Sequence, residues 1–278
     1  MVKFLIMVLL LGSFLWAQED LKSDPLTHKI ESFLGEKSYS ENRDFIHAVF
    51  EPKAAFYKND RVDVVKVVQT LKENGLLKLF FKTPREFTLH FKTSGSPLFF
   101  VKLMSDTLRS IGYYRYVTTD STLDAAAFVW SINLRSEYAT DPLVLQNELQ
   151  KSGCEIIDIE KNSPTEWSYV IDISNAKLNV KVVQSGEKLK LKRSLYAHWL
   201  NISQIRKLKI TSSKRNSWYP YIAFYDASLH LIKIIKKDKI YNFLSLNMPK
   251  NAVYMKISDL YTLKNVRDQL LLSASGRR

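Results

Sequence analysis

The sequence predicts an α+β protein in which tandem α-β-β repeats precede an antiparallel β-sandwich. Two observations predict this fold. A helix–glycine–strand pattern recurs three times between residues 59 and 175. From about residue 177 the helical period gives way to short extended segments separated by turn residues. The chain has 278 residues, 46% of them hydrophobic, which is enough for about two ordinary domains. We therefore divide the chain into residues 1–17, 18–58, 59–175 and 176–278.

Residues 1–17 (MVKFLIMVLLLGSFLWA) have the organisation of a secretory signal peptide. Lys3 supplies a short basic region, an apolar run follows, and Ala17 is the small residue at the expected cleavage site. The run is shorter than the about 20 apolar residues of a transmembrane helix. Leu15 departs from the small residue preferred three positions from the end, so an uncleaved membrane anchor is the alternative. An exported chain with one cysteine, Cys154, suits the periplasm.

The repeated part of the chain follows a polar, partly helical arm or linker at residues 18–58. Gly75, Gly112 and Gly153 are spaced by 37 and 41 residues, and an apolar or aromatic run follows each. We expect each glycine to end a helix in the left-handed conformation. A leucine stands four residues before each glycine: Leu71, Leu108 and Leu149. One such unit cannot bury its own apolar face, so we expect neighbouring units to share a core. The alternative is a chance similarity of three ordinary junctions.

The internal pattern of each unit predicts one helix and two strands. Val64, Val67, Val68 and Leu71 recur at the spacing of a helical stripe. Thr83–Pro84 in the first unit and Ser163–Pro164 in the third are predicted to open the turn between the two strands. The second strands of the three units are predicted at residues 86–93, 126–134 and 166–174.

Residues 176–278 are predicted to form a basic β-sandwich. Short runs alternate apolar with polar residues, as in Leu189–Leu191 and Leu208–Ile210, and turn residues separate them. This region holds 21 Lys and Arg but five Asp and Glu, whereas residues 18–175 hold 19 and 23. The excess predicts an anionic partner: phospholipid head groups, lipopolysaccharide phosphates, an acidic glycan or an acidic protein. The export signal argues against nucleic acid, and the alternative is that lysines only solubilise the surface.

Aromatic residues crowd one part of the basic region, among them Trp199, Phe224 and Tyr225. Sugar rings pack on exposed aromatic faces, and cations hold acidic substituents. Alternation places Tyr219, Tyr221 and Tyr225 on one face and Pro220, Ile222 and Phe224 on the other. The alternative is that all these aromatics belong to the core; otherwise Trp218, at a loop edge, is predicted to be the exposed ring. The predicted ligand-binding residues are Trp218, Tyr219, Tyr221, Lys214 and Arg215. The predicted residues for long-range attraction are Lys233, Lys236, Lys237 and Lys239.

The segment from Ile202 to Asp259 resembles the galactose-binding-like jelly-roll domains, above all in the run Ala252–Ile257 (AVYMKI). The whole organisation, together with the sequence Trp218–Tyr219–Pro220–Tyr221, also resembles poorly characterised periplasmic proteins of flagellated epsilon-class proteobacteria, some of them linked to motility. These resemblances imply a carbohydrate-binding or motility-associated role.

No motif in the sequence identifies a catalytic site, a metal site or a cofactor. The five histidines show no metal-ligand spacing, and no phosphate-binding glycine loop is present. Asp226 and Asp259 end two apolar strands and are interpreted as turn caps, with a calcium site as the alternative. We therefore predict a non-enzymatic periplasmic scaffold that docks on an anionic or glycan component of the envelope. The alternatives are a structural accessory of an envelope machine such as the flagellar motor, which would bind other envelope proteins, and a hydrolase using Glu137, Asp141 or Glu166.

Overall fold

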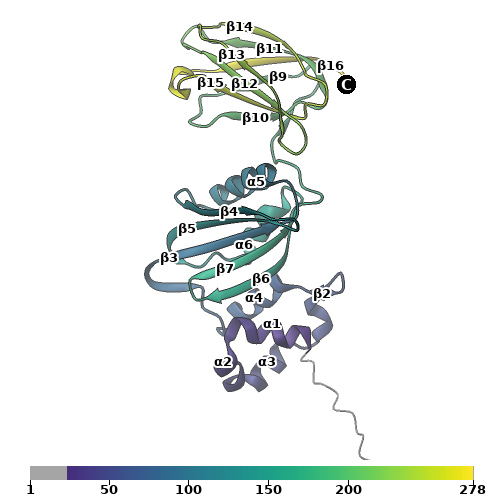
Figure 1. The fold of residues 1–278 in the computed structure, drawn as a ribbon, viewed down its shortest axis with the longest axis vertical. Helices are drawn as coiled ribbons and strands as arrows, with labels where there is room; N and C mark the ends of the chain where they lie inside the picture. The colour runs from purple at the N-terminus through teal and green to yellow at the C-terminus, as the bar shows by residue number, and fades with distance from the viewer. Residues whose placement is uncertain (1–23, 278) are drawn as a thin grey trace, which may run out of the picture. The chain divides into compact units, whose positions relative to one another are not determined.

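The computed structural model describes residues 24–277 and shows a mixed α/β chain that is mostly sheet (Figure 1). The predicted signal peptide at residues 1–17 lies outside the described residues. The described chain divides into two compact units, with the division in the sequence between Lys78 and Leu79. This boundary falls inside the range 59–175 that the sequence predicted as one region.

The N-terminal unit is mainly helical. It contains α1 (Pro25–Leu34), α2 (Glu36–Glu41), α3 (Arg43–Val49), α4 (Val64–Glu73), the 3-10 turn η1 (Lys53–Phe56), and strands β1 (Tyr57–Lys58) and β2 (Arg61–Val62). Leu26, Ile30 and Phe33 form a buried stripe on α1, so the segment predicted as a partly helical arm or linker contains helices, and one of them has a buried face. The stripe on α4 predicted from Val64 to Leu71 is confirmed by burial.

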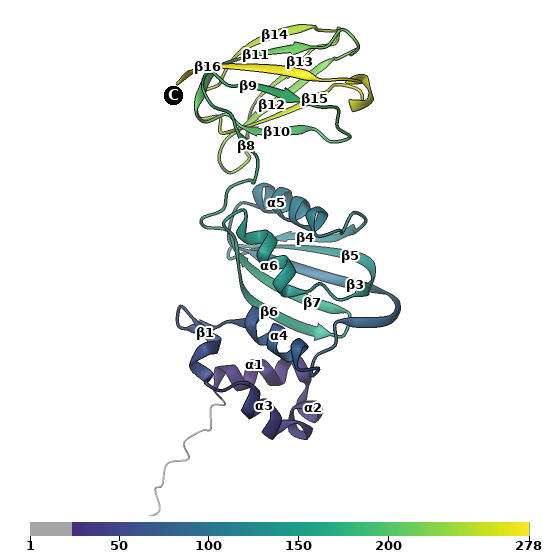
Figure 2. The ribbon, with the colours of Figure 1, turned by 180° about the vertical axis from the view of Figure 1, so that it is seen from behind.

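The first part of the C-terminal unit is a five-stranded sheet with two helices. Its elements are β3 (Phe80–Thr93), α5 (Pro97–Ser110), β4 (Val117–Leu123), β5 (Phe128–Tyr138), α6 (Pro142–Gln150), β6 (Glu155–Ser163) and β7 (Glu166–Asp172). The strand order is β4-β5-β3-β7-β6, and only the β3–β7 pair is parallel. Figure 2 shows α6 beside this sheet, and Phe100 of α5 packs edge-on against Phe128 of β5.

Two sequence predictions for residues 59–175 have different outcomes. The left-handed glycines are confirmed, since φ is +72° at Gly75, +100° at Gly112 and +75° at Gly153. At Gly153 a Cβ would also stand 2.8 Å from the carbonyl oxygen of Asn175, so glycine is required. The turn predicted at Ser163–Pro164 is confirmed between β6 and β7, whereas the turn predicted at Thr83–Pro84 is wrong. Strand β3 runs through it with an irregular register, because its first residues lie largely exposed where a proline is tolerated.

The second part of the C-terminal unit consists of two further sheets. Their strands are β8 (Lys181–Val182), β9 (Lys188–Leu191), β10 (His198–Asn201), β11 (Ile205–Ser212), β12 (Pro220–Tyr225), β13 (Leu231–Lys236), β14 (Phe243–Asn247), β15 (Tyr254–Asp259) and β16 (Leu270–Arg277), with the 3-10 turn η2 (Leu263–Asn265). One sheet has the order β13-β12-β15-β10-β8, and the other has the order β14-β11-β16-β9.

The two C-terminal sheets share one buried cluster of side chains. Phe224 and Ile257 contribute from the first sheet, and Leu208 and Leu272 from the second. Each strand therefore turns one set of alternate side chains to this core and the other set outward. The outward sets of the two sheets are the surfaces available for recognition.

Candidate functional site

Trp218 belongs to the shared core, so the prediction that its ring is exposed is wrong. Its side chain is 0% exposed, and its Nε1–H donates to the carbonyl oxygen of Ser258 over 2.9 Å. The cause is alternation: Trp218 precedes β12 and has the same parity as the buried residues Pro220, Ile222 and Phe224. An indole with a satisfied N–H inside the core cannot stack on a ligand.

The two predicted tyrosines are half-buried. The alternation of β12 is confirmed for the core, because Ile222 and Phe224 belong to the shared cluster while Tyr221 and Tyr225 are partly exposed. Ala223, which has the same parity as the tyrosines, is also buried. Lys236 Nζ lies 5.6 Å from the centre of the Tyr221 ring on the adjacent strand. Tyr219 makes an edge-on contact with Tyr261 at 5.0 Å between ring centroids.

The remaining predicted cations lie in the turn before β12 and on or just after β13. Lys214 and Arg215 are exposed in the turn between β11 and β12. Lys233 and Lys239 are exposed as well, whereas Lys237 is partly buried with its Nζ 5.8 Å from the Tyr241 ring centroid. These residues do not line the groove described next.

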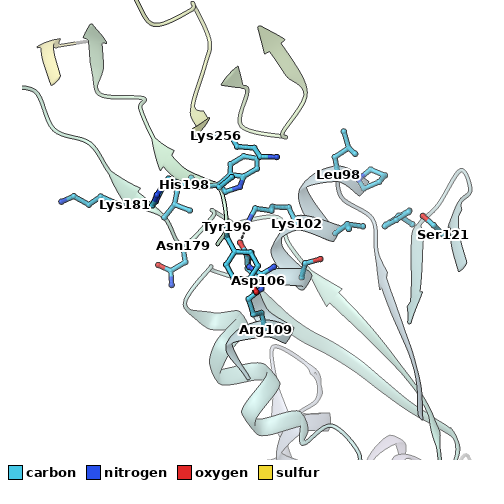
Figure 3. Close-up of a pocket in the computed structure, with 17 residues that line it drawn as sticks. Leu98, Lys102, Asp106, Arg109, Ser121, Asn179, Lys181, Tyr196, His198 and Lys256 are labelled. Carbon is cyan, nitrogen blue, oxygen red and sulfur yellow. Dashed lines mark hydrogen bonds and ion pairs between the residues drawn. The ribbon is translucent and has the colours of Figure 1, made fainter. Parts of the chain in front are cut away.

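A groove of about 880 Å³ lies between α5 and the outward face of the sheet that contains β10 (Figure 3). We call it the α5–β10 groove. It is lined by α5, residues 179–181, residues 196–199 and Lys256 on β15, with contributions from β4 and β5. Its volume is that of a pocket for a small molecule or a short oligosaccharide. It therefore combines residues from the predicted repeat region and from the predicted basic region.

Three cations and one carboxylate stand at the centre of the groove. Lys102, Asp106 and Arg109 lie on α5 at i, i+4 and i+7, which places them on one helix face. Asp106 forms ion pairs with Lys102 and, over 3.6 Å, with Arg109. Lys256 brings the third cation from β15, so the centre holds a net positive charge. Lys181, at the rim, is paired with Glu187 over 2.9 Å.

Two aromatic rings hold these cations in place. Lys102 Nζ lies 5.0 Å and Lys256 Nζ 5.9 Å from the centre of the Trp199 ring. The guanidinium carbon of Arg109 lies 4.4 Å from the centre of the Tyr196 ring. Cation–π contacts of this kind orient flexible cationic side chains. Trp199 is itself stacked on Tyr225 at 5.1 Å between centroids, which fixes its plane.

Burial perturbs two titratable groups in the groove. Burial lowers the pKa of Lys102, and the ion pair with Asp106 only partly offsets the effect. Repulsion from Arg109 and Lys256 lowers this pKa further. Burial also lowers the pKa of His198, and a hydrogen bond with the Lys192 backbone, which raises this pKa, offsets the effect only in part. A bound anion would relieve both groups, because it stabilises their charged forms.

The sequence contained signals for part of this groove. The i, i+4, i+7 spacing on α5 was readable, and Trp199 stood among the crowded aromatics. The opposition of Trp199 to Lys256 arises from pairing of β10 with β15, more than 50 residues apart, and no local pattern encodes it.

Two of the three acids considered for hydrolysis, Asp141 and Glu166, are engaged by neighbouring groups, and the third, Glu137, is exposed on β5. Asp141 caps α6 by accepting from Leu143 N over 3.0 Å. Glu166 Oε1 lies 2.9 Å from His90 Nε2. The other ring nitrogen of His90, Nδ1, lies 2.8 Å from Oγ of the buried residue Ser131. Asp226 and Asp259 accept backbone N–H groups in their turns, as expected of caps.

No protein-family model, curated protein or solved structure matches this chain. Within residues 24–277, no helix is both long and apolar enough to cross a lipid bilayer. The same residues contain no group of three or more His, Cys, Asp or Glu side chains arranged to hold a metal ion.

Proposed function

We propose that this is an exported, non-enzymatic protein of the periplasm that binds an acidic glycan of the cell envelope in the α5–β10 groove. In this proposal the two C-terminal sheets are a β-sandwich of the galactose-binding-like kind, and the preceding α-β-β units supply the opposing wall. The signal peptide predicted for residues 1–17 supports this compartment. The protein needs no cofactor for this role, and nucleic acid is not its partner.

The observation that carries the proposal is the convergence of Lys102, Arg109 and Lys256 with Trp199 and Tyr196 in one groove. Carboxylate or phosphate substituents pair with the cations, and Arg109 offers a planar fork to them. Sugar C–H faces pack against aromatic rings. Polar neutral groups on Ser105, Ser121 and Asn179 line the same groove and suit sugar hydroxyls.

Calorimetric titration with oligogalacturonate and with a neutral galacto-oligosaccharide of matched length tests this proposal. The chain should begin at residue 18, which retains every described residue. We expect the acidic ligand to bind at least tenfold more tightly, since charged hydrogen bonds contribute about 1.5–3 kcal/mol. Lys256→Gln should remove most of this preference, and Lys239→Gln, outside the groove, should not. Equal binding of the two ligands would contradict the proposal.

A second candidate is a structural accessory of an envelope machine such as the flagellar motor, and strand β4 favours it. Every residue of β4 is exposed, and β4 forms one edge of its sheet. Val117 and Leu123 are 67% and 66% exposed, and Tyr114 just before them is 71% exposed. An open edge with apolar residues can accept a strand from a partner protein. Recovery of one protein partner from membranes, lost in Val117→Asp/Leu123→Asp but kept in Lys256→Gln, would support this candidate.

A further inference from the structure

The sheet formed by β14, β11, β16 and β9 has an outward face of a different character from the groove. On β11, Leu208, Ile210 and Ser212 are buried, so Lys207, Lys209 and Thr211 point outward. On β9 the exposed residues are Lys188 and Lys190. We call the outward set the lysine face: Lys188, Lys190, Lys207, Lys209, Thr211, Phe243, Ser245, Asn247, Leu271, Ser273 and Ser275.

Strand register arranges this face in three rows. The first row is Asn247–Lys207–Ser275, the second is Ser245–Lys209–Ser273–Lys188, and the third is Phe243–Thr211–Leu271–Lys190. Lys209 and Lys188 are therefore two strands apart, about 10 Å, and Lys207 and Lys209 are about 7 Å apart along one strand. The four ammonium groups form an array on an open sheet face.

The charge of this array is uncompensated within its own sheet. The four strands contain six Lys and Arg and no Asp or Glu. The ion pairs between described residues do not include the four lysines of the face. The direct cross-strand neighbours of Lys207 and Lys209 are Asn247, Ser245, Ser273 and Ser275, which hydrogen-bond without neutralising charge.

Two large apolar side chains stand in the third row. Phe243 is 53% exposed and Leu271 is 44% exposed, and both lie opposite Thr211 on the neighbouring strand. Lysines beside exposed Phe and Leu match the two components of a bilayer surface: anionic head groups and the outer part of the acyl region. A soluble acidic polymer would use the lysines but leave the apolar pair in water.

We infer that the lysine face docks on a bilayer surface that contains anionic phospholipid. This contact is distinct from the glycan site, because the α5–β10 groove lies on the outward face of the other sheet. The four lysines provide the attraction, and Phe243 and Leu271 enter the interface. The two C-terminal sheets can thus bind a membrane surface through one outward face and a glycan through the other.

Binding to vesicles of equimolar phosphatidylcholine and phosphatidylglycerol, compared with phosphatidylcholine alone, tests this inference. The chain should begin at residue 18, because the apolar run before it would itself enter a bilayer. At about 1 kcal/mol for each lysine, Lys207→Gln/Lys209→Gln should weaken binding to the anionic vesicles about thirtyfold. Phe243→Ser should weaken the binding that remains at high salt, where the lysines are screened.

The matched control is Lys233→Gln/Lys236→Gln, which removes the same charge from β13 of the other sheet. We expect it to weaken vesicle binding less than about threefold. Equal losses in both double variants, or equal binding to neutral vesicles, would overturn the inference. The inference would also be overturned if Lys207→Gln/Lys209→Gln lost affinity for oligogalacturonate and kept its affinity for the anionic vesicles. Unchanged oligogalacturonate affinity and thermal midpoint in that variant show that the groove and the fold are intact, so this test and that of the glycan proposal can fail separately.

Discussion

Replacing Trp218 by alanine should destabilise the C-terminal unit strongly. The side chain is fully buried in the shared core. A tryptophan buries about 150–250 Å², which at about 25 cal/mol per Å² corresponds to about 4–6 kcal/mol. Its N–H to Ser258 O adds about 1 kcal/mol. Since alanine keeps the Cβ and the site relaxes partly, we expect Trp218→Ala to lower the free energy of unfolding by about 4 kcal/mol.

Urea unfolding followed by circular dichroism measures this loss, and Trp199→Ala is the comparison. Trp199 is partly exposed on the outward face of β10, so its removal should cost about 1–2 kcal/mol. Where Trp218→Ala remains folded, its affinity for oligogalacturonate should equal that of the unmodified chain, because Trp218 does not line the groove. A loss below about 1 kcal/mol in Trp218→Ala, or equal losses in the two variants, would refute the placement of Trp218 in the core.

Three further predictions concern single side chains. Asp259→Ala should cost about 3 kcal/mol in urea unfolding, because Asp259 accepts from the backbone N–H groups of Tyr219, Tyr261 and Thr262; a neutral outcome would show that these turns hold without it. Burial raises the pKa of Cys154 to about 12, so the thiol is neutral at pH 8 and iodoacetamide should label it only after unfolding; equal rates in native and unfolded chains would contradict this. Burial lowers the pKa of His198, so its charge appears only as pH falls below its usual value of about 6.5. Affinity for a sulfated oligosaccharide, which stays anionic, should therefore rise on acidification, and His198→Gln should abolish the rise.

Features encoded by neighbouring residues were predictable from the sequence. The stripe from Val64 to Leu71 and the left-handed glycines depend on residues that are close together in the sequence, and both are confirmed. The alternation of β12 was also predicted correctly. Extending it two residues upstream would have placed Trp218 in the core, but the turn chemistry before it favoured a loop edge. The prediction gave more weight to the local turn residues than to the alternation of the strand. In the structure, packing in the shared core determines the position of the ring.

The groove depended on information that local patterns lack. Lys102 and Arg109 mark one face of α5, yet nothing in the sequence states which surface that face meets. The basic excess was assigned to residues 176–278 alone, whereas the central cations come from both α5 and β15. Composition reports how much charge a segment carries, and only the strand pairing and the helix position decide where those charges converge.

The most direct test of the central claim is the indole N–H resonance of Trp199, assigned with Trp199→Phe, during titration by oligogalacturonate. The account predicts that this resonance shifts with the acidic ligand, because Trp199 lines the groove between Lys102 and Lys256, and that a neutral galacto-oligosaccharide leaves it in place. A Trp199 resonance that does not move at saturating oligogalacturonate would contradict it.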